Sequence, residues 1–384
     1  CVLLIYITLM AYIRIKMKFW YTQPVFHIYN IWYWLNPPGL ILESAPEINK
    51  YTNLIDIKTY GISDINETLL DRACHFIKAY YVQSPNAKYV PEKKQIIDYL
   101  ESCNNESYLS LYQTPKLLFE KAEPSSVADD IISVITARPL NITLKGKKPF
   151  TLYYVDNLCV HPDYRKDGIA PQTIQTHYYN LRKNNPKIKA CLFKREGKLN
   201  AIVPLTTYKT VCFNISILEK MNPGVLNVIE IGPNQLTLFV NFIYAQSKNF
   251  DCIIMPDLSN ILNLIKSENI YIYGVLQNNN LIAAYAFRRP SLFYDKEEAI
   301  ECFFSLYADT LEDIYITGFN ISLNKCKEKL KTNILLIEDI GQSGKLIDYL
   351  RNNLLNVLFQ SPTAFFLYNY ACYTVPSKNA LIFY

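Results

Sequence analysis

One stretch, Tyr153-Tyr-Val-Asp-Asn-Leu-Cys-Val-His-Pro-Asp-Tyr-Arg-Lys-Asp-Gly-Ile-Ala-Pro171, gives the strongest indication of the fold. It continues an apolar run from Phe150 that predicts a strand ending at Val160. A glycine-bearing loop follows, and a helix is expected to begin near Pro171, since proline suits a first helical turn. Free N–H groups and the dipole at a helix N-terminus bind anions, so the loop is a candidate phosphate site. Taken alone, such a short pattern also fits a polar surface turn.

The loop Arg165-x-x-Gly168-x-Ala170 resembles the Arg/Gln-x-x-Gly-x-Gly/Ala loop of the GCN5-related acyltransferase superfamily. Three separated stretches carry a narrower resemblance. They are Asn157-Leu-Cys-Val-His161 with the loop after it, Phe19-Trp-Tyr-Thr-Gln-Pro-Val25, and Leu367-Tyr-Asn-Tyr370 before the apolar end Ala380-Leu-Ile-Phe-Tyr384. In these stretches the chain resembles the N-myristoyltransferase family. The resemblance runs from about residue 17 to the last residue, and the sequence between the motifs has diverged.

The resemblance implies an α+β fold. Two acyl-CoA N-acyltransferase-like halves would be related by a pseudo-two-fold around a saddle-shaped, mostly antiparallel sheet. Residues 17–215 would form the half that binds myristoyl-CoA. Residues 216–384 would bind the peptide and supply the C-terminal carboxylate. Residues 1–16 are expected to lie outside the fold, because Met17 directly precedes the motif at Phe19.

The implied function is that of a glycylpeptide N-tetradecanoyltransferase. Myristoyl-CoA would be the co-substrate, with no permanently bound cofactor, and the acceptor would be the N-terminal glycine amine of a protein or peptide. Two alternatives stay open. One is transfer of a shorter acyl chain, and the other is a non-catalytic module that binds acyl-CoA or an acylated protein.

Three residues carry the implied chemistry. The backbone N–H groups of Asn157 and Leu158 would form the oxyanion hole, where each donor is typically worth ~3 kcal/mol in the transition state. Asn157 stands where the family has phenylalanine, but a main-chain donor tolerates that change. The main-chain carboxylate of Tyr384 would be the general base, since a glycine α-ammonium with a pKa near ~8 must lose a proton before attack. For Asn157 and Leu158 the alternative is an ordinary strand end. For Tyr384 it is a plain structural strand without a catalytic role.

Acyl-CoA contacts follow from the same resemblance. Cys159 is expected to be a buried apolar contact rather than a nucleophile, since no paired base is near in sequence. The full set is Lys18, Phe19, Trp20, Asn157, Leu158, Cys159, Val160, Arg165, Lys166, Gly168, Ile169 and Ala170.

The match weakens at the peptide-binding positions. The family's acidic run has become Tyr81-Val-Gln-Ser-Pro85, and its peptide-contacting histidine is missing from Leu205-Thr-Thr-Tyr-Lys-Thr210. The motifs implied to bind acyl-CoA are therefore better preserved than the residues implied to bind the peptide. The residues implied to contact a substrate peptide are Tyr81, Val82, Tyr208, Ser291 and Asp339.

The composition of the chain limits which kinds of partner are expected. The net charge of +5 is modest and spread along the chain, which does not indicate a nucleic-acid groove. Ten cysteines occur singly and the four histidines lack metal-ligand spacing, so no metal is expected. Unpaired cysteines favour a reduced, cytoplasmic protein. The apolar residues 1–13 fall short of the ~20 that a membrane span needs. A monomer is expected.

Periodicity predicts the remaining elements. Residues 17–62 should form an extended arm, and a helix should begin at Asn66. Strands are expected at 108–112, 131–144 and 188–194, with a hairpin at 270–289. Further helices are expected at about 92–102, 235–248, 296–307 and 322–330, and from Gly344.

Overall fold

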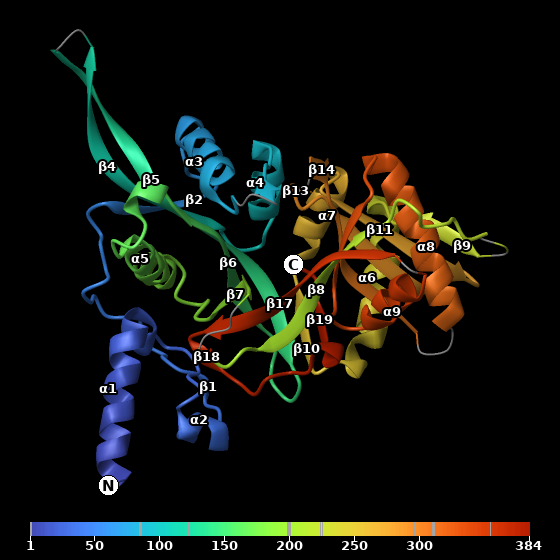
Figure 1. Ribbon diagram of the computed structural model, residues 1–384, viewed down its shortest axis with the longest axis horizontal. Coiled ribbons are helices and arrows are strands. Elements are labelled where there is room, and N and C mark those ends of the chain that lie inside the picture. Colours follow the sequence, from blue (N-terminus) through green and yellow to red (C-terminus); the bar gives the residue numbers. More distant parts are fainter. Residues whose placement is uncertain are drawn as a thin grey trace.

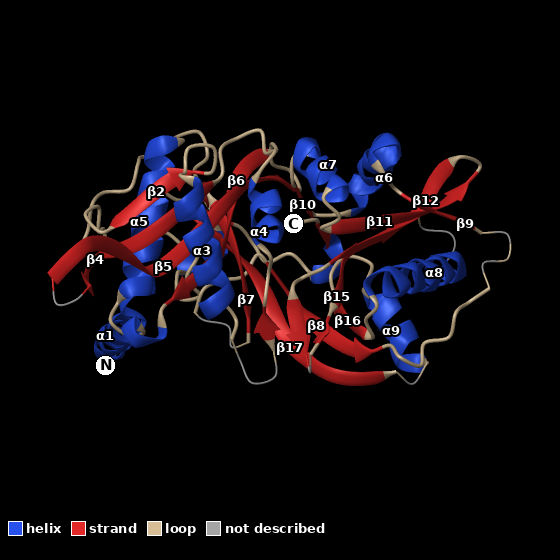
Figure 2. Cartoon of the chain, turned by 90° about the horizontal axis from the view of Figure 1, so that it is seen from above, coloured by secondary structure: helices blue, strands red, loops and turns tan. Residues whose placement is uncertain are grey.

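The computed structural model describes the chain except for residues 1, 84–86, 121–122, 198–200, 223, 225, 295, 309–311 and 354. A long, mostly antiparallel sheet runs through the molecule, with helices packed along it (Figures 1 and 2). The order along the sheet is β19 (Ala380–Ile382), β10 (Cys252–Met255), β5 (Glu123–Leu144), β6 (Phe150–Val160), β7 (Cys191–Glu196), β17 (Asn356–Tyr368), β8 (Thr206–Asn214), β16 (Ile334–Glu338), β15 (Ile300–Tyr307), β12 (Asn280–Arg288), β11 (Ile270–Gln277) and β9 (Asn227–Glu230). Strand β4 (Tyr108–Glu120) pairs with β5, and β2 (Ile57–Gly61) pairs with β4.

The same unit occurs twice in this sheet. In the first, β5 and β6 are antiparallel, and α5 (Ile169–Asn184) leads to β7, which is parallel to β6. In the second, β12 and β15 are antiparallel, and α8 (Glu312–Leu330) leads to β16, which is parallel to β15. This repetition of element order, which sequence self-similarity does not reveal, confirms the expected α+β class with two related halves.

The two units exchange their final strands. Strand β8, which follows β7, pairs with β16 of the second unit, and β17, which follows β16, pairs with β7 of the first. Strands β8 and β17 also pair with each other. The sheet is therefore continuous across the molecule, and the exchange is what a pseudo-two-fold between the units produces.

Several local predictions are confirmed. The side chain of Asn66 caps α3 (Glu67–Tyr80) by accepting a hydrogen bond from the N–H of Thr68. Helices α4 (Lys93–Leu100), α6 (Leu236–Gln246) and α9 (Gly344–Asn352) lie where periodicity places them. Strands β11 and β12 form the predicted hairpin. Helix α7 (Leu258–Lys266) was not predicted.

Other predictions are wrong. Residues 296–307 form the short strand β14 (Glu297–Glu298) and then β15, not a helix. Every residue of β15 is buried between β12 and β16, so pairing in the sheet overrides the local helix preference. The helix predicted at 322–330 begins earlier, at Glu312.

The N-terminal segment is not an extended arm throughout. It contains α1 (Val2–Tyr21), α2 (Ile31–Leu35) and β1 (Gly39–Leu40). Helix α1 projects from the body of the molecule (Figure 1) and has a break at Lys18, where φ is 24°. The dispensability of residues 1–16 stays a prediction.

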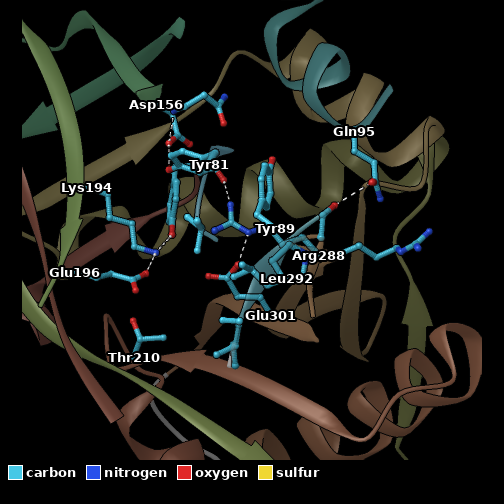
Figure 3. A pocket seen from close by; sticks show the side chains of 18 of the residues that line it. Tyr81, Tyr89, Gln95, Asp156, Lys194, Glu196, Thr210, Arg288, Leu292 and Glu301 are labelled. Atoms are coloured by element: carbon cyan, nitrogen blue, oxygen red, sulfur yellow. Dashed lines mark hydrogen bonds and ion pairs between the residues drawn. The ribbon is translucent and has the colours of Figure 1, made fainter. Parts of the chain in front are cut away.

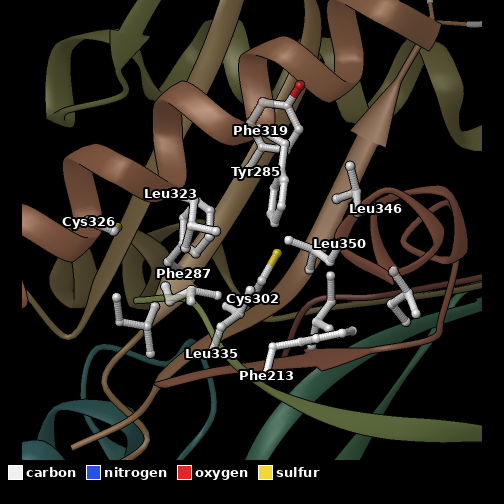
Figure 4. Close-up of a cluster of buried hydrophobic side chains, with 14 of the residues drawn as sticks. Phe213, Tyr285, Phe287, Cys302, Phe319, Leu323, Cys326, Leu335, Leu346 and Leu350 are labelled. Carbon is white, nitrogen blue, oxygen red and sulfur yellow. The ribbon is translucent and has the colours of Figure 1, made fainter. Parts of the chain in front are cut away.

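The second unit has a core of large side chains between its sheet and helices α8 and α9 (Figure 4). Gly318 of α8 lies against this sheet. A Cβ at this position would come within 2.5 Å of Val275 Cγ2 and 2.8 Å of the Tyr285 hydroxyl. Only glycine therefore permits this approach without a shift. The buried members drawn include Phe213, Tyr285, Phe287, Cys302, Phe319 and Leu323.

Small strands close one side of the region where the two units meet. Strand β3 (Lys88–Tyr89) pairs with β13 (Leu292–Tyr294), which pairs with β14. Strand β18 (Tyr370–Ala371) pairs with β1 at another edge. The first group brings the segment after α3 next to the segment after β12, and both segments contribute to a cavity.

Candidate active site

A cavity of about 1060 Å³ opens where the two units meet (Figure 3). The first unit supplies β6 and β7, and the second supplies the end of β12 and the last residue of the chain. Charged side chains make up a large part of its wall. The charged side chains that line it are Arg138, Asp156, Lys194, Arg195, Glu196, Arg288, Arg289 and Glu301.

The strand β6 is interrupted at the predicted oxyanion site. Val134 of β5 pairs with Cys159 and Thr136 pairs with Asp156, so Asn157 and Leu158 together lie opposite one residue of β5. This is a β-bulge, a feature common next to active sites. Asn157 has a φ of 54°, which asparagine tolerates better than most residues. Its side-chain amide donates to the Thr136 hydroxyl at 3.0 Å, which fixes the bulge.

The main-chain N–H of Asn157 already has a partner. It donates a hydrogen bond of 2.7 Å to Oδ1 of Asp156, and the hydroxyl of Tyr81 donates to the same oxygen at 2.8 Å. Figure 3 shows Asp156 and Tyr81 side by side on the cavity wall. An N–H and an O–H therefore converge on a single anionic oxygen at this site.

The last residue is fixed in the cavity wall, although chain ends usually fray. Tyr384 is 4% exposed, and its main-chain oxygen accepts a 2.9 Å hydrogen bond from Nη1 of Arg288. Its hydroxyl donates to Oε1 of Glu338 at 2.9 Å and accepts from Nζ of Lys194 at 2.8 Å. Burial raises the pKa of this phenol, which therefore stays protonated. Side chains from both units thus hold Tyr384 in the cavity wall.

The predicted phosphate loop has the expected strand–loop–helix form. Gly168 adopts a φ of 81° directly before α5, which begins at Ile169, two residues earlier than predicted. Arg165 turns back onto the strand, where its Nε donates to the carbonyl of Val160 at 3.1 Å. Lys166 is exposed, with a φ of 76°. The loop is not among the residues that line the cavity.

The apolar members of the predicted acyl-CoA set pack into the fold around this loop. Val160 and Ile169 are buried in one cluster, with Ala170 packed against it. Cys159 is buried in another cluster, beside α3. Burial raises the pKa of the Cys159 thiol to about 12, so it stays protonated, which fits an apolar contact better than a nucleophile.

The N-terminal aromatic pair lies against the sheet. Phe19 is buried and meets Trp20 and Tyr51 edge to face, with centroids 5.2 and 5.1 Å away. Trp20 stacks on Phe193 of β7 at 5.8 Å. Lys18 is exposed at the helix break. The segment therefore covers the strand next to β6.

The predicted peptide contacts divide into two groups. Tyr81, Val82 and Ser291 line the cavity, while Tyr208 and Asp339 do not. The buried hydroxyl of Tyr208 donates to Oε1 of Glu338 at 3.0 Å, so it joins the network under Tyr384. Asp339 is half-buried, and burial raises the pKa of its carboxyl. Residues 84–86, at the position of the family's acidic run, lie outside the described residues.

The sequence motifs do not indicate the charged residues of the cavity wall, among them Asp156, Lys194, Arg288 and Glu301. Asp156 stands directly before a quoted motif but has no matching carboxylate in it, and Lys194, Arg288 and Glu301 belong to no motif. The available signal was a charge within an otherwise apolar run, as at Glu301. It could not have indicated that these side chains line a cavity.

Two such α+β units that share one sheet and enclose a cavity have the architecture of an acyl-CoA N-acyltransferase. The particular fold is that of N-myristoyltransferase. The chain matches the Saccharomyces cerevisiae N-myristoyltransferase with bound myristoyl-CoA over 94% of each chain, with a TM-score of 0.69 and 13% sequence identity. A structure of that enzyme with myristoyl-CoA and inhibitors matches over 95% of this chain and 93% of the other, with a TM-score of 0.67 and 13% identity. No protein-family profile and no curated protein matches the sequence.

The described residues contain no group of three or more histidine, cysteine, aspartate or glutamate side chains arranged to hold a metal ion. In the same part of the chain, no helix has the length and apolar character needed to span a bilayer.

Proposed function

We propose that this chain transfers myristate from myristoyl-CoA to the N-terminal glycine amine of a protein or peptide. The fold supports acyl transfer in general, and the yeast enzyme of the same fold suggests myristoyl-CoA as the acyl donor. The glycine acceptor follows from the sequence resemblance. One observation carries the proposal: Asn157 of the bulge and Tyr384 line the same cavity, although their positions differ by 227 residues.

The chemistry assigns a role to each group. The thioester carbonyl would bind the N–H groups of Asn157 and Leu158, while the CoA phosphates rest on the loop around Gly168. The acceptor enters as an ammonium, because an α-amino group has a pKa of about 7.7–8.0. The Tyr384 carboxylate takes one of its protons, and the free amine then attacks the carbonyl carbon.

The bonds and protons balance without an acyl-enzyme intermediate. The new C–N bond forms, the C–S bond breaks, and the negative charge that develops on oxygen is stabilised by the main-chain donors. CoA leaves as a thiolate, which takes up the second proton that the amine loses on becoming an amide.

A second candidate is a non-catalytic acyl-CoA-binding module. Both proposed catalytic groups already have hydrogen-bond partners, which favours this candidate. The N–H of Asn157 donates to Asp156, and the main-chain oxygen of Tyr384 accepts from Arg288. Transfer of a shorter acyl chain is a variant of the first proposal. The two are distinguished by the length of the acyl chain that the protein transfers fastest.

The decisive experiment is mass spectrometry of a Gly-initiated peptide incubated with the protein and myristoyl-CoA. A mass gain of one myristoyl group is expected, and acetyl-CoA should give little product. Faster transfer from acetyl-CoA would favour the short-chain variant. CoA binding without any transfer would favour the binding module.

A further inference from the structure

Asp156 occupies a position that the reaction needs. Its Oδ1 accepts from the N–H of Asn157 at 2.7 Å and from the hydroxyl of Tyr81 at 2.8 Å. Both distances lie in the range expected of donors around an oxyanion. The carboxylate oxygen therefore stands in for the oxygen of a tetrahedral intermediate, on the bulge where that intermediate is expected.

This arrangement opposes catalysis as it stands. A thioester carbonyl cannot share the N–H of Asn157 with a carboxylate, and a fixed negative charge beside it would repel the charge that develops during attack. In the described part of the chain, Asp156 has no ion pair with lysine, arginine or histidine. Within that part of the chain, its Oδ1 is held by two hydrogen bonds and by no ion pair, so a cation that approaches it closely can compete with those two donors.

We propose that Asp156 is a built-in occupant of the oxyanion hole, released when the primary ammonium group of the acceptor pairs with its carboxylate. This inference rests on the proposed function. The ammonium brings the missing cation, the carboxylate swings away to meet it, and the N–H of Asn157 becomes available to the thioester. Acceptor binding thus opens the site for acyl transfer, and without an acceptor the thioester is protected from water.

The same geometry gives Tyr81 a second role. Once Asp156 leaves, the hydroxyl of Tyr81 and the N–H of Asn157 both face the vacated position, so Tyr81 becomes a side-chain donor to the oxyanion. Burial, together with the nearby Asp156, raises the pKa of Tyr81, so the phenol keeps its proton and remains a donor. A residue expected only to contact the peptide thereby joins the catalytic group.

The test compares Asp156→Asn, which preserves shape but removes the charge, with Glu196→Gln, which removes a carboxylate elsewhere on the cavity wall. Calorimetry with a non-hydrolysable myristoyl-CoA analogue present measures the affinity of a Gly-initiated peptide and of its desamino counterpart, which lacks the ammonium. The parent should favour the ammonium peptide by about tenfold, a charge-assisted hydrogen bond being the difference. Asp156→Asn should lose this preference, and Glu196→Gln should retain it.

A second readout is hydrolysis of myristoyl-CoA without any acceptor. It should rise by about tenfold in Asp156→Asn, because the oxyanion hole no longer holds an anion. An Asp156→Asn protein that keeps the ammonium preference, or that hydrolyses no faster than the parent, overturns the inference.

The variant Tyr81→Phe provides an independent check should Asp156→Asn fail to fold. It removes one of the two donors that hold the carboxylate, so the ammonium peptide should bind several-fold more tightly while transfer slows. Unchanged binding and unchanged transfer would refute the inference. If the parent binds both peptides without transferring myristate, the proposed function fails while the ammonium preference remains measurable, so the two failures are distinguishable.

Discussion

Arg288 contacts Tyr384 in two ways. Its Nη1 donates a hydrogen bond of 2.9 Å to the main-chain oxygen of Tyr384, and its Cζ lies 4.4 Å from the centroid of the Tyr384 ring. The Nε of Arg288 pairs with Glu301 at 2.8 Å, and both side chains are nearly buried. The arginine belongs to β12 and the glutamate to β15, so the second unit of the fold positions the proposed base.

The first prediction concerns this buried ion pair. Arg288→Gln should lower the free energy of unfolding by ~3 kcal/mol, because it removes the cation that is hydrogen-bonded to the buried carboxylate of Glu301. The double variant Arg288→Gln with Glu301→Gln should recover part of the loss. Urea denaturation measures both. A double variant less stable than the single one would show that the charge balance is not what matters.

The phosphate loop can be tested through its glycine. Gly168 has a φ of 81°, and a Cβ there would meet nothing within 4 Å, so only the backbone conformation restricts which residue fits. Gly168→Val should weaken CoA binding at least tenfold, whereas Gly168→Asn should lose much less, since asparagine tolerates a left-handed conformation. Calorimetry with CoA distinguishes them. Equal affinity in the two variants would contradict the assignment.

The close approach of α8 to its sheet predicts a packing defect. Gly318→Ala should destabilise the protein by ~1–3 kcal/mol, because the added methyl group would overlap Val275 and Tyr285. Combining it with Val275→Ala should restore part of the stability by making room. Thermal denaturation followed by circular dichroism gives the comparison. An additive loss in the double variant would argue against the overlap.

A buried histidine predicts a pH dependence. His177 of α5 is 1% exposed, its Nδ1 lies 2.7 Å from the Ser110 hydroxyl, and burial lowers its pKa to about 3. The unfolded chain binds a proton near pH ~6.5 and the folded chain does not, so stability should fall as the pH drops from about 6.5 towards 3. His177→Gln should flatten this slope in urea titrations at several pH values. An unchanged slope would show that other groups cause it.

Local structure was predictable where a residue acts on its own neighbours. Asn66 caps α3, the apolar run from Phe150 forms β6, and Gly168 precedes α5. The sequence pattern predicts a helix at β15, and this prediction is wrong. Pairing with β12 and β16 makes the segment a strand, and the sequence pattern within the segment does not show that pairing.

The residues of the site also divide into those that the sequence indicates and those that depend on distant partners. The resemblance located Asn157, Tyr81 and Tyr384, and all three line one cavity. Asp156 and Arg288 could not be assigned, since the role of each depends on a partner brought close only by the folded sheet. The strand exchange between β8 and β17 likewise leaves no periodic signal in the sequence.

If the main-chain carboxylate of Tyr384 is the general base, moving that carboxylate should abolish most of the transfer. Adding two glycines after Tyr384 puts an uncharged amide in its place and shifts the charge by several ångströms. The matched variant Tyr384→Phe keeps the terminus and the ring but removes the hydroxyl that contacts Lys194 and Glu338.

Single-turnover transfer of myristate to a Gly-initiated peptide should be measured on both, with CoA affinity as the control. The extended protein should bind CoA normally but transfer myristate about 100 to 10,000 times more slowly, the usual loss for a positioned base. Tyr384→Phe should keep substantial activity. Transfer by the extended protein at the parent rate would contradict the account.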